Sequence, residues 1–416
     1  MPSQHITEGE PTQPGGIVVP LDLEGLRILK QEVQADGKLR VEVIATKKGE
    51  RCPHCGVTCV KQHDVRPRRK RDVPLRGHRV ELVLHKRRFW CRHCRKAFTE
   101  SDTACGRRRR TTARLREEIG KQASTRPIAQ VASQYHVGPR FVQACLEVVA
   151  SVQLAKRGLS LQEGAPLPTP RYLGIDEFAR RKGHCYDTIL CDLEERHVLE
   201  VSAGRTKDDV TCVLERLSTC DAVEAVSMDM SRSFREAVQL CLPRARIVVD
   251  HFHVIQHINK AVKKVIGRWA KQAEGKQALE GHSPLFLRNQ EDLSAEDEQS
   301  RANLAQRFPE IAAAWQLKEA LRAWYASASL ASAAASLDAW IAQVKRDGPT
   351  ELRQALSAFR DWRQEILAFF AFLPTRLSNG FVEGKNNRTK AIMRQGYGYR
   401  NRRHLRLRIL MEEIAS

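Results

Sequence analysis

The sequence predicts a mixed α/β protein built from several modules. Three observations predict this class: strand-like alternation with paired cysteines up to residue 100, an α/β pattern of short apolar runs from residue 172, and an Ala-rich helical pattern over residues 254–370. The length of 416 residues favours two to four folded units.

The charge of the chain indicates a nucleic-acid partner. Its 70 Lys and Arg residues exceed its 49 Asp and Glu residues, which leaves a formal net charge of +21. Such an excess favours a polyanion, either nucleic acid or an anionic membrane surface. No apolar run approaches the roughly 20 residues that a membrane-spanning helix needs, and the polar N-terminus lacks the layout of a signal peptide. We therefore expect a cytoplasmic protein without membrane association.

The N-terminal part is expected to be a tail followed by a β-rich domain. Residues 1–16 are polar and contain three prolines, which predicts a disordered tail. In the domain over residues 17–105, apolar residues alternate with polar ones at 39–44 and 80–85, which is typical of strands with one buried face.

Two Cys-x-x-Cys pairs predict a zinc site in this domain. Cys52 and Cys55 are separated from Cys91 and Cys94 by 35 residues. Two such pairs supply the four thiolates of a tetrahedral Zn²⁺ ion, and an extended hairpin between them would form a zinc ribbon. We expect one structural zinc ion; a redox pair or unligated core cysteines are the alternatives. The neighbours expected not to bind the metal are His54, Cys59, His63 and His93.

Basic residues in the hairpin, and an arginine run after it, are expected to contact DNA phosphates because their fields add along a polyanionic backbone. A solvated surface is the alternative for the arginine run. The group comprises Arg68, Arg69, Lys70, Arg71, Arg107, Arg108, Arg109 and Arg110.

A helix-turn-helix domain is predicted over residues 106–160. Pro127 suits the first position of a helix, and Gly138 would open the next one. Such a pair presents its second helix to the major groove of DNA, where Arg140 and Gln143 would read the bases. A plain helical hairpin is the alternative.

The remainder is expected to be a catalytic core interrupted by helices. Residues 161–170 contain three prolines and a glycine, which predicts a linker. We expect the first part of the core at 171–256, a helical insertion at 257–370, and the end of the core with a basic tail at 371–416.

Acidic residues in the core predict phosphoryl transfer. Asp176, Asp229 and Asp250 each follow an apolar run, and Glu383 lies far downstream. The order of strand with Asp, two strands, helix, strand with Asp, helix and strand is the layout of a ribonuclease-H-like sheet. Clustered carboxylates repel one another and need divalent cations to stay ionised together. Two Mg²⁺ or Mn²⁺ ions about 3.5–4 Å apart can activate attacking and leaving oxygens at phosphorus.

At these motifs the sequence resembles bacterial insertion-sequence transposases of the ISL-three family, which are DDE transposases with a ribonuclease-H-like core. The resemblance runs roughly from residue 38 to residue 411. The motifs that carry it include Cys52-Pro-His-Cys55-Gly56, Arg88-Phe-Trp-Cys91-Arg-His-Cys94, Gly174-Ile-Asp176-Glu177, Met228-Asp229-Met-Ser231, Asp250-His-Phe-His253 and Glu383-Gly-Lys-Asn386-Asn387.

The resemblance implies that Asp176, Asp229 and Glu383 are the catalytic acids and the magnesium ligands. Asp250 with His253 resembles an auxiliary Asp-x-x-His element, and Asp250 stays an alternative to Asp229 as the second ligand. Water would attack at the ends of the element, and the freed 3′-hydroxyl would then attack target DNA. The implied partners are the terminal inverted repeats and target DNA, bound by at least a homodimer on the nucleoid of a bacterial cytoplasm.

A basic C-terminal group is expected to contact phosphates around this site, with a solvated helix surface as the alternative. It comprises Lys385, Arg388, Lys390, Arg394, Arg400, Arg402 and Arg403. Two other functions stay open: a DNA-binding regulator that has lost catalysis, and a structure-selective nuclease on the same sheet.

Overall fold

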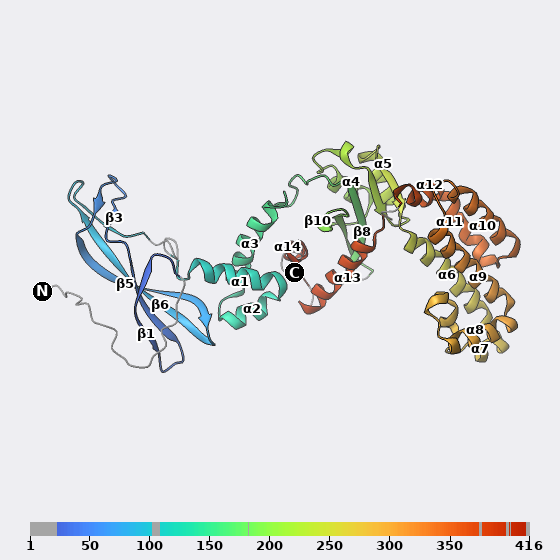
Figure 1. Cartoon of the computed structure of the whole chain (residues 1–416), viewed down its shortest axis with the longest axis horizontal. Helices are drawn as coiled ribbons and strands as arrows, with labels where there is room; N and C mark the ends of the chain where they lie inside the picture. Colours follow the sequence, from blue (N-terminus) through green and yellow to red (C-terminus); the bar gives the residue numbers. More distant parts are fainter. Residues whose placement is uncertain are drawn as a thin grey trace. The chain divides into compact units, whose positions relative to one another are not determined.

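The structure, a computed structural model, describes residues 23–101, 109–181, 183–373, 377–396, 399 and 401–412, and they form a mixed α/β fold (Figure 1). The chain divides into two units, one up to residue 153 and one from residue 154 onwards. The expected tail 1–16 lies outside the described residues, as do Arg107, Arg108 and Arg400.

The first unit begins with a β-rich region around one mixed sheet. Its order is β1-β2-β6-β5, and β7 also pairs with β6. The strands are β1 (Leu26–Val33), β2 (Leu39–Ala45), β5 (Gln62–Leu75), β6 (His78–Cys91) and β7 (Lys96–Thr99). β5 and β6 form an antiparallel hairpin, and β2 runs parallel to β6.

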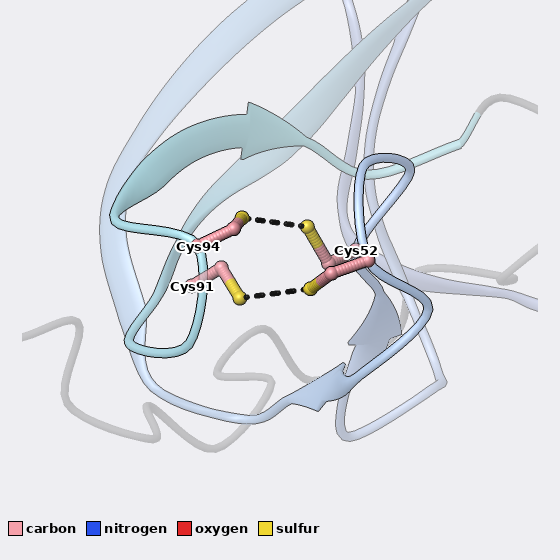
Figure 2. Close-up of side chains that lie close together, drawn as sticks. Cys52, Cys91 and Cys94 are labelled. Carbon is pink, nitrogen blue, oxygen red and sulfur yellow. Dashed lines mark hydrogen bonds between the residues drawn. The ribbon is translucent and has the colours of Figure 1, made fainter.

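The hairpin explains the long gap between the two cysteine pairs. A small second sheet, β3 (Glu50–Arg51) with β4 (Thr58–Cys59), carries Cys52 and Cys55 in its connecting loop. The chain then runs out along the 14 residues of β5 and back along the 14 residues of β6, which ends at Cys91. The two pairs therefore face each other at one end of the hairpin (Figure 2).

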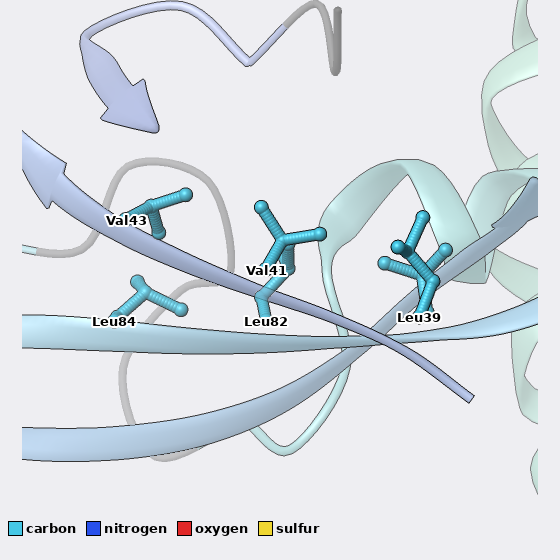
Figure 3. Close-up of a cluster of buried hydrophobic side chains, with 6 residues drawn as sticks. Leu39, Val41, Val43, Leu82 and Leu84 are labelled. Atoms are coloured by element: carbon cyan, nitrogen blue, oxygen red, sulfur yellow. The ribbon is translucent and has the colours of Figure 1, made fainter. Parts of the chain in front are cut away.

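The core of this sheet follows from the period-two pattern of its strands. β2 and β6 pair in a register that sets their apolar residues side by side on one face (Figure 3). The polar residues between them, such as Arg40 and Glu42, stay half-buried. The cluster consists of Leu39, Val41, Val43, Val80, Leu82 and Leu84.

Three helices complete the first unit: α1 (Ala113–Thr125), α2 (Ile128–Tyr135) and α3 (Pro139–Ala155). The side chain of Thr112 caps α1 by accepting from the backbone N–H of Leu115. A three-residue turn joins α2 to α3, and its first residue, His136, adopts a left-handed φ of 49°. Gly120 of α1 lies against the backbone of α3, because a Cβ there would be 2.6 Å from the carbonyl oxygen of Cys145.

The second unit contains a five-stranded sheet of order β10-β9-β8-β11-β12. The strands are β8 (Tyr172–Arg181), β9 (Cys185–Asp192), β10 (His197–Ala203), β11 (Ala225–Met228) and β12 (Arg246–Val249). β8, β9 and β10 are antiparallel neighbours, whereas β11 runs parallel to both β8 and β12. The helices α4 (Lys207–Leu214) and α5 (Arg232–Cys241) connect β10 to β11 and β11 to β12.

A helical part follows β12 (Figure 1), as the Ala-rich pattern predicts. Two tryptophans fix its packing: the indole N–H of Trp340 donates to the carbonyl of Leu317 at 2.8 Å, and that of Trp324 donates to the carbonyl of Ala333 at 3.1 Å. The helices are α6 (His251–Trp269), α7 (Ala273–Ala278), α8 (Ala295–Arg307), α9 (Pro309–Ser327), α10 (Ala333–Asp347), α11 (Thr350–Asp361) and α12 (Arg363–Leu367).

The chain then returns to the sheet as α13 (Gly380–Gln395) and α14 (Arg402–Glu412). α13 packs on β8 and α14 packs on β10. Gly174 of β8 has no side chain where α13 comes close: a Cβ there would lie 2.6 Å from Val382 and 3.1 Å from Asn379.

A buried ionic network holds α14 against β10. The carboxylate of Glu200, which is 1% exposed, accepts from Arg406 at 3.0 Å and from Arg216 at 2.5 Å. The guanidinium of Arg406 also donates to the carbonyls of Ser160 and Leu161, both at 3.2 Å. These bonds hold the start of the expected linker against α14.

Within the part of the chain that the structure describes, every helix is too short or too polar to cross a lipid bilayer.

Glu200→Ala is expected to lower the free energy of unfolding by about 3–5 kcal/mol, because it leaves the buried guanidinium of Arg406 and the half-buried one of Arg216 without their carboxylate. Urea titration of the full chain measures the change. Glu195→Ala is the control, since Glu195 is exposed in the turn before β10 and should change stability by less than about 0.5 kcal/mol. Equal losses in both variants would contradict the buried network.

Candidate metal centres and acidic site

The sheet of the second unit sets three aspartates in one row. β11 pairs in parallel with β8 on one side and with β12 on the other, and the structure fixes both registers. Continued past the end of β11, these registers set Asp229 level with Asp176 of β8 and with Asp250 after β12. Neighbouring strands lie about 4.8 Å apart, so the three carboxyl groups start from adjacent positions.

The place of Asp176 directly after an apolar run predicts that its strand ends there, but the strand does not end at Asp176. β8 continues to Arg181, and Asp176 pairs opposite Ile189 of β9. The strand continues because the hairpin to β9 supplies backbone partners beyond the point where the parallel neighbour β11 stops. Asp176 therefore lies where the parallel pairing ends and the antiparallel pairing goes on.

The Asp176 carboxyl group is 8% exposed and well hydrogen-bonded. Its Oδ1 accepts from the backbone N–H of Glu177 at 2.7 Å, and its Oδ2 accepts from the side-chain amide of Asn386 at 2.6 Å. Burial, and then the negative charge of Asp229, raise the pKa of Asp176 to about 7, although these hydrogen bonds and His253 act the other way. The site thus disfavours two adjacent negative charges.

His253, in the first turn of α6, lies against Asp229. Its Nδ1 is 2.7 Å from Oδ1 of Asp229 and 4.0 Å from Oδ2 of Asp250. Burial acts to lower the pKa of His253, but the contact with Asp229 and the charges of the neighbouring aspartates outweigh it and raise this pKa. A protonated His253 therefore compensates part of the negative charge of the row.

Asp250 has a different environment from the other two aspartates. It is 1% exposed and caps α6: its Oδ1 accepts from the N–H of Phe252, and its Oδ2 accepts from the N–H of Asn379, both at 3.1 Å. Burial acts to raise the pKa of Asp250, but contacts with His251 and the N–H of Phe252 keep it below its ordinary value. Both of its oxygens are therefore engaged within the fold.

Asp176 and Asp229 line an open hollow of about 480 Å³, whereas Asp250 is not part of its lining. Arg205 contributes the positive charge of this hollow. Its guanidinium donates to Glu177 at 2.5 Å and lies 3.6 Å from the ring centre of Tyr186. The hollow is thus lined by three carboxyl groups, those of Asp176, Glu177 and Asp229, and by one cation that is paired with Glu177, an acidic lining suited to divalent cations.

Glu383 comes from α13, the helix whose Asn386 contacts Asp176. It is half-buried in the first turn of α13, three residues before Asn386, and so lies on the same helix face as the amide that contacts Asp176. Among the described residues, ligand atoms of three or more candidate side chains gather within 4.8 Å only at the four cysteines. Asp176, Asp229 and Glu383 therefore do not form a compact set in this structure.

The four predicted cysteines form the one compact set of metal ligands among the described residues. Their sulfur atoms lie within 4.8 Å of one another, with 3.6 Å between Cys52 and Cys94 and 3.5 Å between Cys55 and Cys91 (Figure 2). A tetrahedral zinc ion with Zn–S distances of about 2.3 Å needs S···S separations of about 3.8 Å. The geometry therefore fits a structural Zn²⁺.

Local backbone geometry favours the thiolate form of Cys91, while burial raises the pKa of Cys94 to about 12. The N–H of Cys94 is the main cause that lowers the pKa of Cys91 to about 6, which favours the thiolate that zinc binds. The residue after each second cysteine turns the chain in the left-handed region, Gly56 at φ 76° and Arg95 at φ 54°. The neighbouring Cys59 is outside the set and packs in the core beside Phe89. His54, His63 and His93 are exposed.

The predicted DNA-contacting residues of the first unit divide into two groups. Lys70 is buried and donates to the carbonyl of Arg109, and Arg71 donates to the carbonyls of Tyr135 and His136. Both side chains thus tie β5 to the segments around it. Gln143 is half-buried and donates to Glu147 at 3.1 Å. The exposed members are Arg68, Arg69, Arg109, Arg110 and Arg140.

The C-terminal basic group divides in the same way. Arg402 donates to the carbonyl of Val201 and to Glu163, and Lys385 lies 5.2 Å from the ring centre of Phe381. The exposed members are Arg388, which pairs with Glu412, Lys390, Arg394 and Arg403.

Asn386 and Arg205 also lie at the acidic site, although neither is among the site residues predicted from the sequence. Asn386 lies three residues after Glu383, a spacing that on a helix puts both side chains on one face. This spacing is visible in the sequence and indicates a role beside the glutamate. Arg205 lies just before the Thr206 cap of α4, and no local pattern connects it to the acidic row.

Two family profiles match the chain. A transposase family of the ISL3 (ISL-three) type, described as "Transposase", matches residues 173–409, which is more than half of the chain. A family described as "zinc-finger of transposase IS204/IS1001/IS1096/IS1165" matches residues 48–94, the segment that contains all four zinc-site cysteines.

The chain is also similar to two proteins that are named as transposases. The chain is 28% identical, over 378 residues, to the transposase for insertion sequence element IS1001 of Bordetella parapertussis, which covers 89% of this chain and 90% of that protein. It is 24% identical, over 258 residues, to the transposase for insertion sequence element IS1557 of Mycobacterium tuberculosis, which covers 56% of this chain and 57% of that protein.

We expect one zinc ion per chain, measured by elemental analysis of the purified protein. Cys91→Ser should lose the zinc because it removes one of four thiolates. Cys59→Ala should keep it, since Cys59 is buried nearby but outside the ligand set. A Cys91→Ser protein with full zinc content, or a wild-type protein with none, would rule out the site.

Asp176→Asn is expected to stabilise the chain at pH 8 by about 2 kcal/mol in magnesium-free buffer. The folded-state pKa of Asp176 is about 7, whereas an unfolded aspartate has a pKa of about 3.9. The folded state therefore binds the extra proton between these pH values, and wild-type stability falls as pH rises through this window. At pH 4 the variant should gain little.

Urea titrations at pH 4 and pH 8 test this pH dependence. Asp208→Asn is the control because Asp208 is exposed on α4. A gain of the same size at both pH values would show that electrostatic repulsion at Asp176 is not its cause.

Proposed function

Because this chain belongs to the ISL3 family of transposases, whose profile matches more than half of it, we propose that it mobilises an insertion sequence. In this proposal it binds the terminal inverted repeats, cleaves at the element ends and joins the 3′-hydroxyl to target DNA. The observation that carries the proposal is the pair of level carboxyl groups, Asp176 and Asp229, lining one hollow.

The catalytic core is proposed to be ribonuclease-H-like. Its sheet order supports this, since three antiparallel strands are followed by two strands parallel to the first of them, with a helix before each of these two. In this arrangement the helices α6 to α12 form an insertion between β12 and α13. The insertion separates Glu383 in sequence from the aspartates of the row.

Asp176, Asp229 and Glu383 are the proposed ligands of two Mg²⁺ ions. The raised pKa of Asp176 supports the assignment, because two carboxyl groups that repel each other gain most from a divalent cation. Bound Mg²⁺ ions would activate the attacking oxygen and stabilise the leaving oxygen. Glu383 lies one turn before Asn386 on the same face of α13, and this shared face supports its assignment as the third ligand.

We prefer Asp229 to Asp250 as the second ligand. Asp229 lines the hollow, whereas both oxygens of Asp250 accept backbone hydrogen bonds in the cap of α6 and from α13. A metal at Asp250 would have to break these bonds in a buried place. His253 is assigned to hold the Asp229 carboxylate in position, and Asn386 to hold that of Asp176.

The first unit is proposed to bind the element ends through a zinc ribbon and a helix-turn-helix. The three-residue turn between α2 and α3 supports the second part, as does the exposed position of Arg140 at the start of α3. Arg68 and Arg69 on β5, with Arg109 and Arg110, supply exposed charges for phosphates. Lys70 and Arg71 are not part of the proposed DNA surface, because their side chains donate hydrogen bonds to backbone carbonyls within the fold.

The remaining contacts and the assembly are part of the same proposal. Lys390, Arg394 and Arg403 are exposed on α13 and α14, so they are free to meet phosphates near the hollow. Pairing two DNA ends requires two active sites, so a homodimer or a larger assembly is proposed on DNA, in a bacterial cytoplasm. The alternative function is a regulator that binds the ends without cutting them.

The first test is cleavage and strand transfer with Mg²⁺ or Mn²⁺ on a duplex that ends in the terminal repeat, whose sequence comes from the DNA flanking the reading frame. Asp176→Asn, Asp229→Asn and Glu383→Gln should each lower cleavage at least about 1,000-fold, which is roughly 4 kcal/mol. Binding of the ends should change less than about threefold, because the ends are proposed to be bound through the first unit and through basic side chains that these substitutions leave unchanged.

Asp208→Asn, on the exposed face of α4, is the matched control and should cut normally. Binding without any cleavage by the wild type would identify a regulator, and cleavage without joining would identify a nuclease. If Asp229→Asn stayed active while a folded Asp250→Asn protein did not, the second ligand would be Asp250.

A further inference from the structure

Helix α6 carries charge of one sign. Its 19 residues include four Lys or Arg residues and three His residues but no Asp or Glu. The helix leads from the end of β12 into the helical part of the second unit (Figure 1). Exposed helices usually alternate both signs, which lets pairs at i and i+4 stabilise them. The positive charges of α6 have no such partners within the helix itself.

The exposed residues of α6 share one face. At about 100° per residue, Phe252, Lys260 and Lys263 lie within about 80° of one another around the helix axis, and Lys264 lies beside them. All four are exposed, and Phe252 is 41% exposed. Gly267 continues the face, and a Cβ there would meet nothing within 4 Å. We call Phe252, Lys260, Lys263, Lys264 and Gly267 the α6 face.

The other basic residue of the helix is used within the fold. Arg268 donates to Glu351 of α11 at 2.8 Å and to Glu310 of α9 at 2.6 Å. Glu351 and Glu310 come from the helices packed against α6, and both are bound to Arg268 at the far end of the helix. Lys260 and Lys263 lie closer to the sheet and present their charge to solvent.

The α6 face starts at the acidic row. His253, at the edge of this face, lies 2.7 Å from Asp229, and the ring of Phe252 is 5.7 Å from the ring of His253. From Phe252 to Lys263 the helix rises about 16 Å, which corresponds to about five base pairs of DNA. The face thus leads away from the proposed site of phosphoryl transfer through the uncharged Gln256 and Asn259, and its positive charges begin at Lys260, about two turns from Phe252.

We infer that the α6 face binds the backbone of the DNA that leads away from the phosphate at the acidic site. The inference rests on the proposed function and adds a DNA surface in the helical part, separate from the zinc ribbon and from the basic C-terminal group. Phe252 is the end of the α6 face at the acidic site. Lys260, Lys263 and Lys264 bind phosphates of the DNA backbone.

Crosslinking tests the location of the DNA. The full chain carries a photo-crosslinking amino acid at position 263 and is irradiated with a labelled random-sequence duplex without divalent cations, so that no cleavage is required. The same group at position 345, exposed on α10, is the control. The DNA should attach to position 263 and not to position 345; equal attachment at both would overturn the inference.

The salt dependence of binding tests the charges. For the same duplex, Lys260→Ala/Lys263→Ala should reduce the slope of log K against log[KCl] by about 1.8, because two phosphate contacts are lost. Lys276→Ala/Lys345→Ala removes two exposed lysines elsewhere in the helical part and should leave the slope unchanged. An unchanged slope in the α6 variant would overturn the inference.

These outcomes separate the inference from the proposed function. A wild-type protein that cuts and joins DNA, with α6 variants that behave like their controls, would refute the α6 face alone. A protein that crosslinks through position 263 but never cuts would refute the transposition proposal while the α6 face stands.

Discussion

Repulsion between two carboxyl groups held at one level of a sheet is the constraint on which the acidic site depends. The register of β8 and β11 sets Asp229 beside Asp176, and the burial of Asp176 limits the screening of its charge by water. The fold compensates only in part, through the amide of Asn386 and the ring of His253. The remaining repulsion favours a divalent cation, so the site's affinity for metal would arise from the same strand pairing that forms the sheet.

The C-terminal helices are needed because the sheet cannot complete this site alone. Asn379 joins α13 to the two ends of the row: its side-chain amide donates to the carbonyl of Ile175, and its backbone N–H donates to Asp250. Asn386 adds the contact to Asp176. The ion pair of Arg406 with Glu200 fixes α14 on the opposite edge strand. The long helical part can therefore separate these segments in sequence without loosening the site.

Local patterns predicted the parts of the fold that local physics decides. Alternation predicted β2 and the start of β6, and cysteine spacing predicted the thiols that meet at one end of the hairpin. The inward direction of Lys70 and Arg71 could not be predicted, because a long basic side chain reaches solvent or a distant carbonyl equally well. The position of Arg205 could not be predicted either, because the ring that it contacts, Tyr186, comes from the separate strand β9.

The different environments of Asp229 and Asp250 follow from where the next helix begins. After β12 the helix starts at His251, so Asp250 itself must satisfy the first free N–H groups, and its carboxylate turns back into the fold. After β11 two further residues intervene, and Ser231 caps α5 instead. Asp229 is thereby released from the capping role and faces the hollow. A serine two residues downstream thus decides which of two equivalent strand-end aspartates is available for chemistry.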